Sequence, residues 1–435
     1  MQFRFDNFGK LRNSHLFNPM EQILLFILYT SVLLGILYYY SKKEKSLLNF
    51  SQLSIAFIAK IIAGCAYGYL FLNLYKGDDT WKLHQAGVVE FQLLIQSPAQ
   101  FFISIFQHGY QENQTMSFFT AHHSYWKDLS DNILIKLLAL FNIFSRGSYY
   151  VNVVFFNFLI FWGHYFLYKL FIKQYENSSR LLFLIVFLFP PLLFWESGIR
   201  KDGLVFLMLM GFLFHFYSFL KTETKKHIFY ALLFWLGLFI FRNFVAMLAI
   251  AVALLWRISH SFPKKTAFIF IVGILLMIAL FFASSLLPND LNLPMQMAKR
   301  QESFQNLSGG SRLALQQLEP NFKSYISILP VAINHSFLRP YPTEISNPLY
   351  LMAFIETILV LAMLIFVLLF NKKFFPELFQ NPFLLGLVLF ALLNYVLIGY
   401  MVPFLGAIIR YKVIYETLLI LVLLRWFKLK HYTIL

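Results

Sequence analysis

The feature that most constrains this chain is a series of long apolar runs separated by short polar stretches. Several runs reach the ~20 consecutive apolar residues that an α-helix needs to cross a bilayer. Of the 435 residues, 59% are hydrophobic and 13% are charged, whereas soluble domains average roughly 45–50% and 25%. The sequence therefore predicts an all-α, polytopic transmembrane helical bundle and excludes an ordinary soluble domain.

About eleven spans are predicted from the positions of these runs. They cover residues 22–40, 55–75, 150–172, 181–195, 203–220, 228–241, 244–256, 267–287, 350–370, 383–401 and 413–424. The apolar stretch 133–144 is short, which favours a re-entrant or interfacial helix over a span. Arg242 and Asn243 either divide a long apolar region into two short spans or lie inside one kinked span.

Lysine and arginine in the short loops predict the orientation, because cytoplasmic loops are enriched in these residues. The positive-inside bias and attraction to anionic lipid headgroups also explain much of the formal charge of +16 without nucleic acid. The side of the N-terminus stays open, since the span count places it outside while its basic residues favour the inside. The basic stretches that share one predicted side are 42–45, 173–180, 221–226, 257–265, 372–373 and 425–430.

Two long loops fall on the opposite, non-cytoplasmic side of the predicted bundle. Residues 76–132 form the first outer loop, which is expected to fold as amphipathic helices at the membrane surface, and residues 288–349 form the second. The whole chain, 1–435, is predicted as a single integral membrane domain without a cleavable signal peptide. No nucleotide-binding loop is recognisable, and chemistry on the outer face has no easy access to ATP or nucleotide sugars.

Carboxylates at the predicted outer ends of spans are the catalytic candidates: Asp78, Asp79 and Glu196. A carboxylate can take a proton from an attacking hydroxyl group as a general base. Asp78 and Asp79 follow the second span, where they could also bind a divalent cation through oxygen ligands. An acidic pair after a glycine is equally typical of a turn and a helix N-cap.

The stretch 189–204, FPPLLFWESGIRKDGL, places Glu196, Arg200, Lys201 and Asp202 between two apolar runs. Charged residues at such a boundary are costly unless they face a wet cavity or partners. Arg200 and Lys201 would lie at a helix N-terminus, where backbone N–H groups and arginine favour phosphate, with Asp202 in support. The alternative is a loop in water with local salt bridges, Glu196 with Arg200 and Lys201 with Asp202.

Three further arginines are phosphate-binding candidates, and three neighbouring side chains would support them. Each has an alternative. Arg242 could simply extend toward water, Arg339 could belong to a proline-rich loop with a Glu–Arg pair, and Arg410 could be part of an interfacial Arg/Tyr anchor. A carboxylate inside a predicted span, as in the 350–370 run, is expensive without a partner. The arginines are Arg242, Arg339 and Arg410, and the supporting residues are Glu344, Glu356 and Tyr411.

The histidine and cysteine residues give no metal or thiol signature. The eleven histidines lack metal-ligand spacing, and the single cysteine, Cys65, lies in a predicted span with no visible base. The sequence therefore predicts no metal site and no cofactor, apart from the possible divalent cation at Asp78 and Asp79.

The layout resembles the GT-C class of polyprenyl-phosphate-sugar-dependent glycosyltransferases, with an acidic motif after an early span and a late outer loop. The segments FPPLLFWESGIRKDG, FLRPYPTE with Glu356, and GAIIRYK resemble parts of multi-span proteins associated with bacterial surface polysaccharides. The resemblance implies that Asp78 or Asp79 is the base, although two spans rather than one precede them. O-antigen polymerases and ligases are similar in span number, outer-face arginines and a large late loop, which residues 288–349 would match.

These features predict a bacterial inner-membrane glycosyltransferase. It would move a sugar from a polyprenyl phosphate or pyrophosphate carrier to a hydroxyl acceptor on a glycan or lipid. The alternatives are an O-antigen-type polymerase or ligase, a lipid-linked sugar flippase or transporter, and a non-catalytic scaffold. A transporter should have internal repeats and charges through the membrane midplane, whereas no repeat is evident and most charges lie near the predicted outer boundary.

Overall fold

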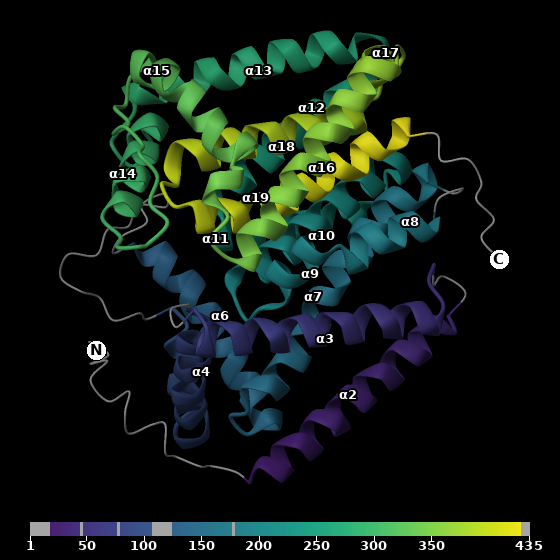
Figure 1. The fold of residues 1–435 in the computed structure, drawn as a ribbon, viewed down its shortest axis with the longest axis vertical. Helices are drawn as coiled ribbons and strands as arrows, with labels where there is room; N and C mark the ends of the chain where they lie inside the picture. Colours follow the sequence, from purple (N-terminus) through teal and green to yellow (C-terminus); the bar gives the residue numbers. More distant parts are fainter. Residues whose placement is uncertain (1–17, 44–46, 76–78, 107–123, 176–178, 428–435) are drawn as a thin grey trace. The chain divides into compact units, whose positions relative to one another are not determined.

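The computed structural model is almost entirely helical over the residues that it describes (Figure 1). No strand occurs in that part of the chain, so the predicted all-α class is confirmed. The described residues are 18–43, 47–75, 79–106, 124–175 and 179–427. They form two compact units: unit 1 takes its residues from 1–114, 128–162 and 193–207, and unit 2 from 115–127, 163–192 and 208–435.

Nine helical segments within the described ranges are long and apolar enough to cross a membrane, which indicates a multi-pass membrane protein. Two other predicted spans are helical but differ: α11 (Lys225–Phe241) has 17 residues, and α19 (Leu405–Leu423) carries three charged side chains. The count of eleven therefore stays a prediction. The nine are α2 (Pro19–Ser41), α3 (Phe50–Asn73), α7 (Tyr149–Phe171), α8 to α9 (Ser179–Ser197), α10 (Lys201–Thr222), α12 (Asn243–Ser261), α13 with its flanking turns (Pro263–Leu286), α16 (Pro348–Phe370) and α18 (Pro382–Met401).

Three of these helices begin with the same local chemistry, an asparagine followed by proline. The side chains of Asn18, Asn347 and Asn381 each accept a hydrogen bond from a backbone N–H of the first turn. Proline suits the first helical position because it lacks an N–H that would need a partner and its φ is already helical. An asparagine cap typically contributes about 1 kcal/mol, so the sequence marks these starts clearly.

Unit 1 is built around α3, which packs against α2 and against α4 (Asp79–Gln96) (Figure 1). The short helix α5 (Pro98–Ile103) packs on α4. Helices α4 and α5 therefore occupy part of the predicted first outer loop. The predicted short helix at 133–144 is the second half of α6 (Tyr125–Ser145), which is not among the candidate spans.

Unit 2 is organised around α18, which packs against α12, α19 and α15 (Phe322–Ile333), while α16 packs against α19 (Figure 1). Small residues allow these close approaches: Gly386 faces the Trp256 ring, and Gly399 faces the backbone of Ala332. Helices α14 (Leu293–Gln305) and α15 come from the predicted second outer loop. That loop is thus folded structure packed on the helices.

Leucine and isoleucine side chains line the outside of two unit 2 helices, α13 (Thr266–Ala283) and α16. Large apolar surfaces of this extent are unusual on soluble monomers and mark contact with a membrane or a partner. Their presence on helices of spanning length supports lipid contact. They include Ile271, Leu275, Leu276 and Leu280 on α13, and Leu351, Ile355, Leu359 and Leu369 on α16.

Candidate functional site

The seam, defined as residues 196–202, joins α9 (Pro190–Ser197) to α10 within unit 1. The alternative prediction, that this stretch is a loop in water, is wrong, because Glu196 and Ser197 have no exposed surface and Arg200 is only 7% exposed. Gly198 permits this burial, since a Cβ there would lie 2.6 Å from the ring of Tyr67 on α3. The seam is therefore a packed part of the interior of unit 1.

A buried lysine that the sequence prediction missed lies under the seam. Lys60, near the middle of α3, donates from Nζ to Ser197 Oγ at 3.2 Å and has no exposed surface. The carboxylate of Glu196 is close enough to attract the Lys60 ammonium group. Two buried charges lose hydration and need both each other and additional hydrogen bonds. The only sequence signal was a lone lysine inside a predicted span.

The two cations of the seam are also held by protein groups. Arg200 Nη1 donates to the Tyr67 hydroxyl at 3.2 Å, and its Nε lies 3.4 Å from Asp202 Oδ2. Lys201 Nζ lies 2.8 Å from Asp131 Oδ1 on α6. These salt bridges differ from the predicted pairs Glu196–Arg200 and Lys201–Asp202, because Arg200 pairs with Asp202 and Lys201 with Asp131, a partner that sequence spacing does not reveal.

Charge balance distinguishes the seam from an open phosphate site. A phosphate arriving here would have to compete with carboxylates that already contact the cations, at a cost in desolvation. The seam therefore fits a network that fixes the α9–α10 connection. The cations of this network are Lys60 together with Arg200 and Lys201 of the seam, and its carboxylates are Asp131 together with Glu196 and Asp202 of the seam.

Asp79 is exposed in the first turn of α4, and Asp78 lies outside the described residues. A negative charge at this position interacts favourably with the positive end of the helix dipole, and the side chain is accessible from outside the protein. Within the described ranges, no three His, Cys, Asp or Glu side chains gather as metal ligands. The possible cation site at Asp78 and Asp79 stays a prediction.

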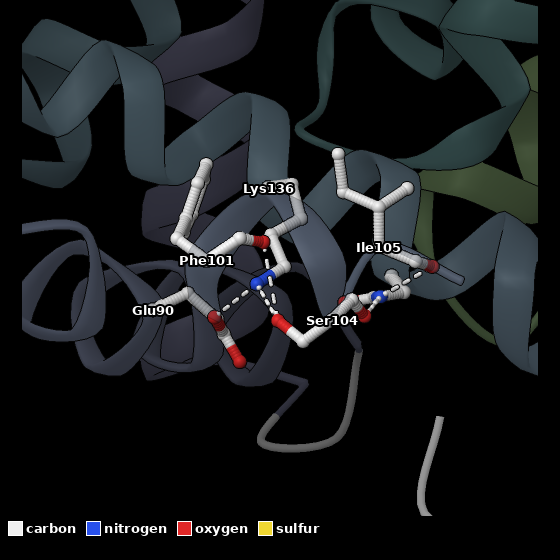
Figure 2. A network of polar contacts seen from close by, with 6 residues as sticks. Glu90, Phe101, Ser104, Ile105 and Lys136 are labelled. Atoms are coloured by element: carbon white, nitrogen blue, oxygen red, sulfur yellow. Dashed lines mark hydrogen bonds and ion pairs between the residues drawn. The ribbon is translucent and has the colours of Figure 1, made fainter. Parts of the chain in front are cut away.

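A second buried lysine in unit 1 shows what a satisfied structural network looks like (Figure 2). Lys136 Nζ on α6 lies 2.6 Å from Glu90 Oε2, donates to Ser104 Oγ at 2.7 Å, and lies 4.1 Å from the Phe101 ring centroid. Asn132 donates to the backbone oxygens of Ser104 and Ile105. These contacts hold the end of α5 against α6, and we assign them a structural role.

In unit 2, three arginines from separate segments converge on Tyr411. The guanidinium carbon of Arg242 lies 4.1 Å from the Tyr411 ring centroid, and that of Arg410 lies 4.7 Å from it. Arg410 Nη2 also donates to the Tyr411 hydroxyl at 3.0 Å. Arg300 on α14 interacts electrostatically with both Arg242 and Tyr411. We call Arg242, Arg300, Arg410 and Tyr411 the arginine cluster.

The backbone around Arg242 explains how this side chain reaches the cluster. Helix α11 ends at Phe241, α12 begins at Asn243, and Arg242 between them has a non-helical conformation (φ −150°, ψ 77°). The structure therefore divides the apolar region into two helices at the predicted position. Arg242 lies where α12, a candidate span, begins.

The electrostatic environment of Arg300 reflects its neighbours. Desolvation, and then the positive charge of Arg242, lowers the pKa of Arg300 to about 10. A nearby anion acts in the opposite direction, because it favours the charged form of arginine. Sequence reasoning missed Arg300, since nothing in the polar segment around α14 separates it from ordinary surface cations.

Arg339 has its own partner in the 338–344 segment. It forms an ion pair with Glu344, whose other carboxylate oxygen accepts from the Tyr341 backbone N–H at 2.8 Å. The Tyr341 ring centroid lies 5.1 Å from the Arg339 guanidinium carbon. This is the Glu–Arg pair in a proline-rich loop that was the alternative to phosphate binding by Arg339. The charge of Arg339 is therefore compensated within its own segment.

Glu356, a supporting candidate, is 2% exposed on α16 and lies beside Lys412 and Glu416 of α19. Lys412 Nζ donates to Thr357 Oγ1 at 2.7 Å and to the Arg339 carbonyl oxygen at 3.1 Å, and it lies 3.7 Å from Glu416 Oε2. The sequence prediction gave no role to Lys412 or Glu416. The available signal was their i,i+4 spacing at the start of an apolar run.

A pocket of about 300 Å³ lies on another face of α14, lined among others by Lys299, Glu302 and Glu319. Successive helical residues are about 100° apart around the axis. The pocket residues of α14 recur at spacings of three and four, which places Arg300 on a different face. The pocket and the arginine cluster are therefore separate features of unit 2.

The structure divides the predicted site residues between the two units and gathers three of them, Arg242, Arg410 and Tyr411, at one place. Unit 1 contains Asp79, Glu196, Arg200, Lys201 and Asp202, while unit 2 contains Arg242, Arg339, Glu344, Glu356, Arg410 and Tyr411. Comparison with protein-family models, with curated proteins and with solved structures found no match in any of the three.

Proposed function

We propose that this protein is a membrane glycosyltransferase that uses a polyprenyl phosphate- or pyrophosphate-linked sugar in the synthesis of bacterial surface polysaccharide or glycoconjugate. The observation that carries the proposal is the arginine cluster of unit 2. Its members have the chemistry of a phosphate site, because the planar guanidinium group binds phosphate oxygens through paired hydrogen bonds.

The close approach of like charges supports an anionic ligand. Since Arg242 and Arg410 both lie close to the Tyr411 ring centroid, their guanidinium carbons are less than about 9 Å apart. At that separation, two unit charges repel by on the order of 2 kcal/mol at an effective dielectric constant near 20. A phosphate between them would replace this repulsion with attraction, and a pyrophosphate would contact all three arginines.

The location of the cluster suits an amphiphilic substrate. Arg242 immediately precedes α12, a candidate span, so its charge falls at one end of an apolar helix. The exposed leucine and isoleucine side chains of α13 and α16 offer an apolar environment for a prenyl chain. A phosphate at the span end and a tail along the apolar helices match the two parts of a polyprenyl-linked donor.

For acceptor activation we propose Asp79 or Asp78 as the general base. Asp79 is exposed, whereas Glu196 is fully buried beside Lys60 and has no direct access to an acceptor. We therefore give Glu196, with Arg200, Lys201 and Asp202, the task of holding the α9–α10 connection. Proton transfer by a positioned carboxylate typically accelerates such a step by roughly 10²–10⁴-fold.

The test is a transfer assay with purified full-length protein in vesicles, radiolabelled polyprenyl-linked sugars and hydroxyl acceptors. We expect labelled product from the wild type and at least a tenfold lower rate from Arg242→Ala and Arg410→Ala, since a hydrogen bond to a charged group contributes about 1.5–3 kcal/mol. The matched control is Arg257→Ala, an exposed arginine on α12 that donates to Ser261. Undiminished transfer by both cluster variants would contradict the proposal.

A lipid-linked sugar transporter is the second candidate, favoured by charges buried inside the helices. Lys60 lies within the candidate span α3, and Glu356 lies within the candidate span α16. Intramembrane ionisable residues often mark transport pathways. Movement of the labelled lipid between leaflets without any product would select this candidate, and the length of any product would separate single transfer from polymerisation.

A further inference from the structure

Two carboxyl groups face each other in the interior of unit 2. Glu356 on α16 is 2% exposed and Glu416 on α19 is 1% exposed, and each affects the other electrostatically. We call them the carboxyl pair. Neither group belongs to the arginine cluster. Both lie on helices that consist mainly of apolar residues. A charged group here needs compensation from its immediate neighbours.

The groups around the carboxyl pair come from four segments. Lys412 shares α19 with Glu416, Thr357 shares α16 with Glu356, and the Tyr395 hydroxyl of α18 hydrogen-bonds to Glu416. The fourth segment contributes the Arg339 carbonyl oxygen, which accepts from Lys412. Lys412 is thus the single cation in contact with the pair among the described residues.

The charge count does not balance if both carboxyl groups are ionised. One ammonium group and two carboxylates leave a net charge of −1 in a low-dielectric interior, which is strongly unfavourable. Lys412 donates to Thr357 Oγ1 and to the Arg339 carbonyl oxygen, and it forms an ion pair with Glu416 Oε2 at 3.7 Å. One proton on the pair makes the group of three neutral.

The hydrogen-bond partners of the two carboxyl groups favour one position for that proton. Neither carboxyl oxygen of Glu356 has a hydrogen-bond partner among the described residues, and the carboxyl group of Glu416 lies close enough to interact with it electrostatically. Two carboxylates repel each other, but a protonated carboxyl group can donate to a carboxylate. Glu416 is the better acceptor because it also contacts Lys412 and Tyr395.

We propose that Glu356 and Glu416 form a proton-binding site in the interior of unit 2, with one proton carried by Glu356 and donated to Glu416. Loss of this proton would leave a second carboxylate competing for Lys412. Lys412 would then be drawn from the Arg339 carbonyl, which it holds at 3.1 Å. The site therefore links protonation to the position of the segment that begins at Arg339.

The test is infrared spectroscopy of the full-length protein in lipid nanodiscs at neutral pH, through the carbonyl band of protonated carboxyl groups. We expect the wild type to show such a band. The frequency of the band should shift only slowly after transfer to D₂O, because the buried proton exchanges slowly with solvent. The band should be lost in Glu356→Gln and also in Glu416→Gln, since each variant leaves one carboxylate paired with Lys412. Glu377→Gln, an exposed carboxylate that accepts from Trp426, is the control and should keep the band.

A variant at the cation adds an opposite prediction. Lys412→Met removes the ammonium group, so neutrality then requires a proton on each carboxyl group, and the band should grow to about twice its wild-type area. A wild type without the band, or a band unchanged in both glutamine variants and in Lys412→Met, would overturn the proposal. If a glutamine variant fails to fold, the presence of the band in the wild type and its change in Lys412→Met still test the proposal.

Discussion

Lys60, Lys136 and Lys412 are buried in the described structure, and each donates to a hydroxyl group and interacts electrostatically with a carboxylate. A buried ammonium group is costly unless such partners replace its water. Most of these partners lie far away in sequence: Lys60 and Ser197 are 137 positions apart, and Lys412 and Thr357 are 55 apart. Glu416, four residues after Lys412, is the exception. Sequence reasoning can identify an expensive residue in an apolar run, but it cannot find a compensating side chain that is distant in sequence.

The pair under the seam gives a residue-scale prediction. Lys60→Met removes the cation beside Glu196 and should lower the free energy of unfolding by about 3–5 kcal/mol, as expected when one partner of a buried ion pair is removed. Thermal unfolding of the purified protein measures the loss. The double variant Lys60→Met with Glu196→Gln should recover part of it, because an uncharged amide replaces the carboxylate that Lys60→Met leaves without its cation.

The matched control is Lys225→Met, at an exposed lysine in the first turn of α11. It should stay within about 0.5 kcal/mol of the wild type. Equal stability of Lys60→Met and Lys225→Met would show that the pair under the seam does not stabilise unit 1.

At the scale of elements, helix existence follows from apolar length, and helix ends follow from local chemistry. The predicted spans 350–370 and 383–401 become Pro348–Phe370 and Pro382–Met401, where Asn–Pro pairs set the starts. The predicted span 181–195 lies within the candidate span Ser179–Ser197, which is broken inside because Phe189 is extended before Pro190. Packing between helices was not predictable, since it depends on small residues meeting at particular positions.

A glycine substitution tests the packing of α18. Gly399→Ala places a Cβ against the backbone of Ala332 on α15, which cannot rotate away as a side chain can. Overpacking of this kind typically costs about 1–3 kcal/mol, so we expect a lower thermal unfolding temperature. Gly35→Ala on α2 is the control: no atom lies within 4 Å of its Cβ, and helix propensity favours alanine by up to about 1 kcal/mol. Equal melting temperatures for the two variants would contradict the close α15–α18 contact.

For the whole molecule, the basic loops predict which side of the membrane each polar segment faces. Single cysteines replace exposed residues in a Cys65→Ser background: Lys225→Cys, Lys264→Cys and Asn289→Cys. We expect a membrane-impermeant maleimide to label Asn289→Cys in intact cells, and the two lysine variants only after permeabilisation, because basic loops stay in the cytoplasm. Labelling of Lys264→Cys and Asn289→Cys from the same side would contradict the orientation across α13.

At the same scale, sequence reasoning found most members of the candidate site but not their grouping. Arg242, Arg410 and Tyr411 were predicted from their positions beside apolar runs, and the structure brings them together. Arg300 was missed because its role depends on α14 packing in unit 2. Arg200 was expected to bind phosphate, yet it is buried beside Asp202, because the tight packing of Gly198 against Tyr67 draws the seam into unit 1.

The central claim is that the arginine cluster binds the phosphate of a polyprenyl-linked substrate. The most direct measurement is the binding of fluorescent polyprenyl phosphate to the full-length protein in nanodiscs, comparing wild type, Arg300→Ala, Arg410→Ala and the control Arg257→Ala. We predict at least tenfold weaker binding for both cluster variants, wild-type binding for the control, and weaker binding at high salt. Wild-type affinity in both cluster variants would contradict the account and move the phosphate site elsewhere.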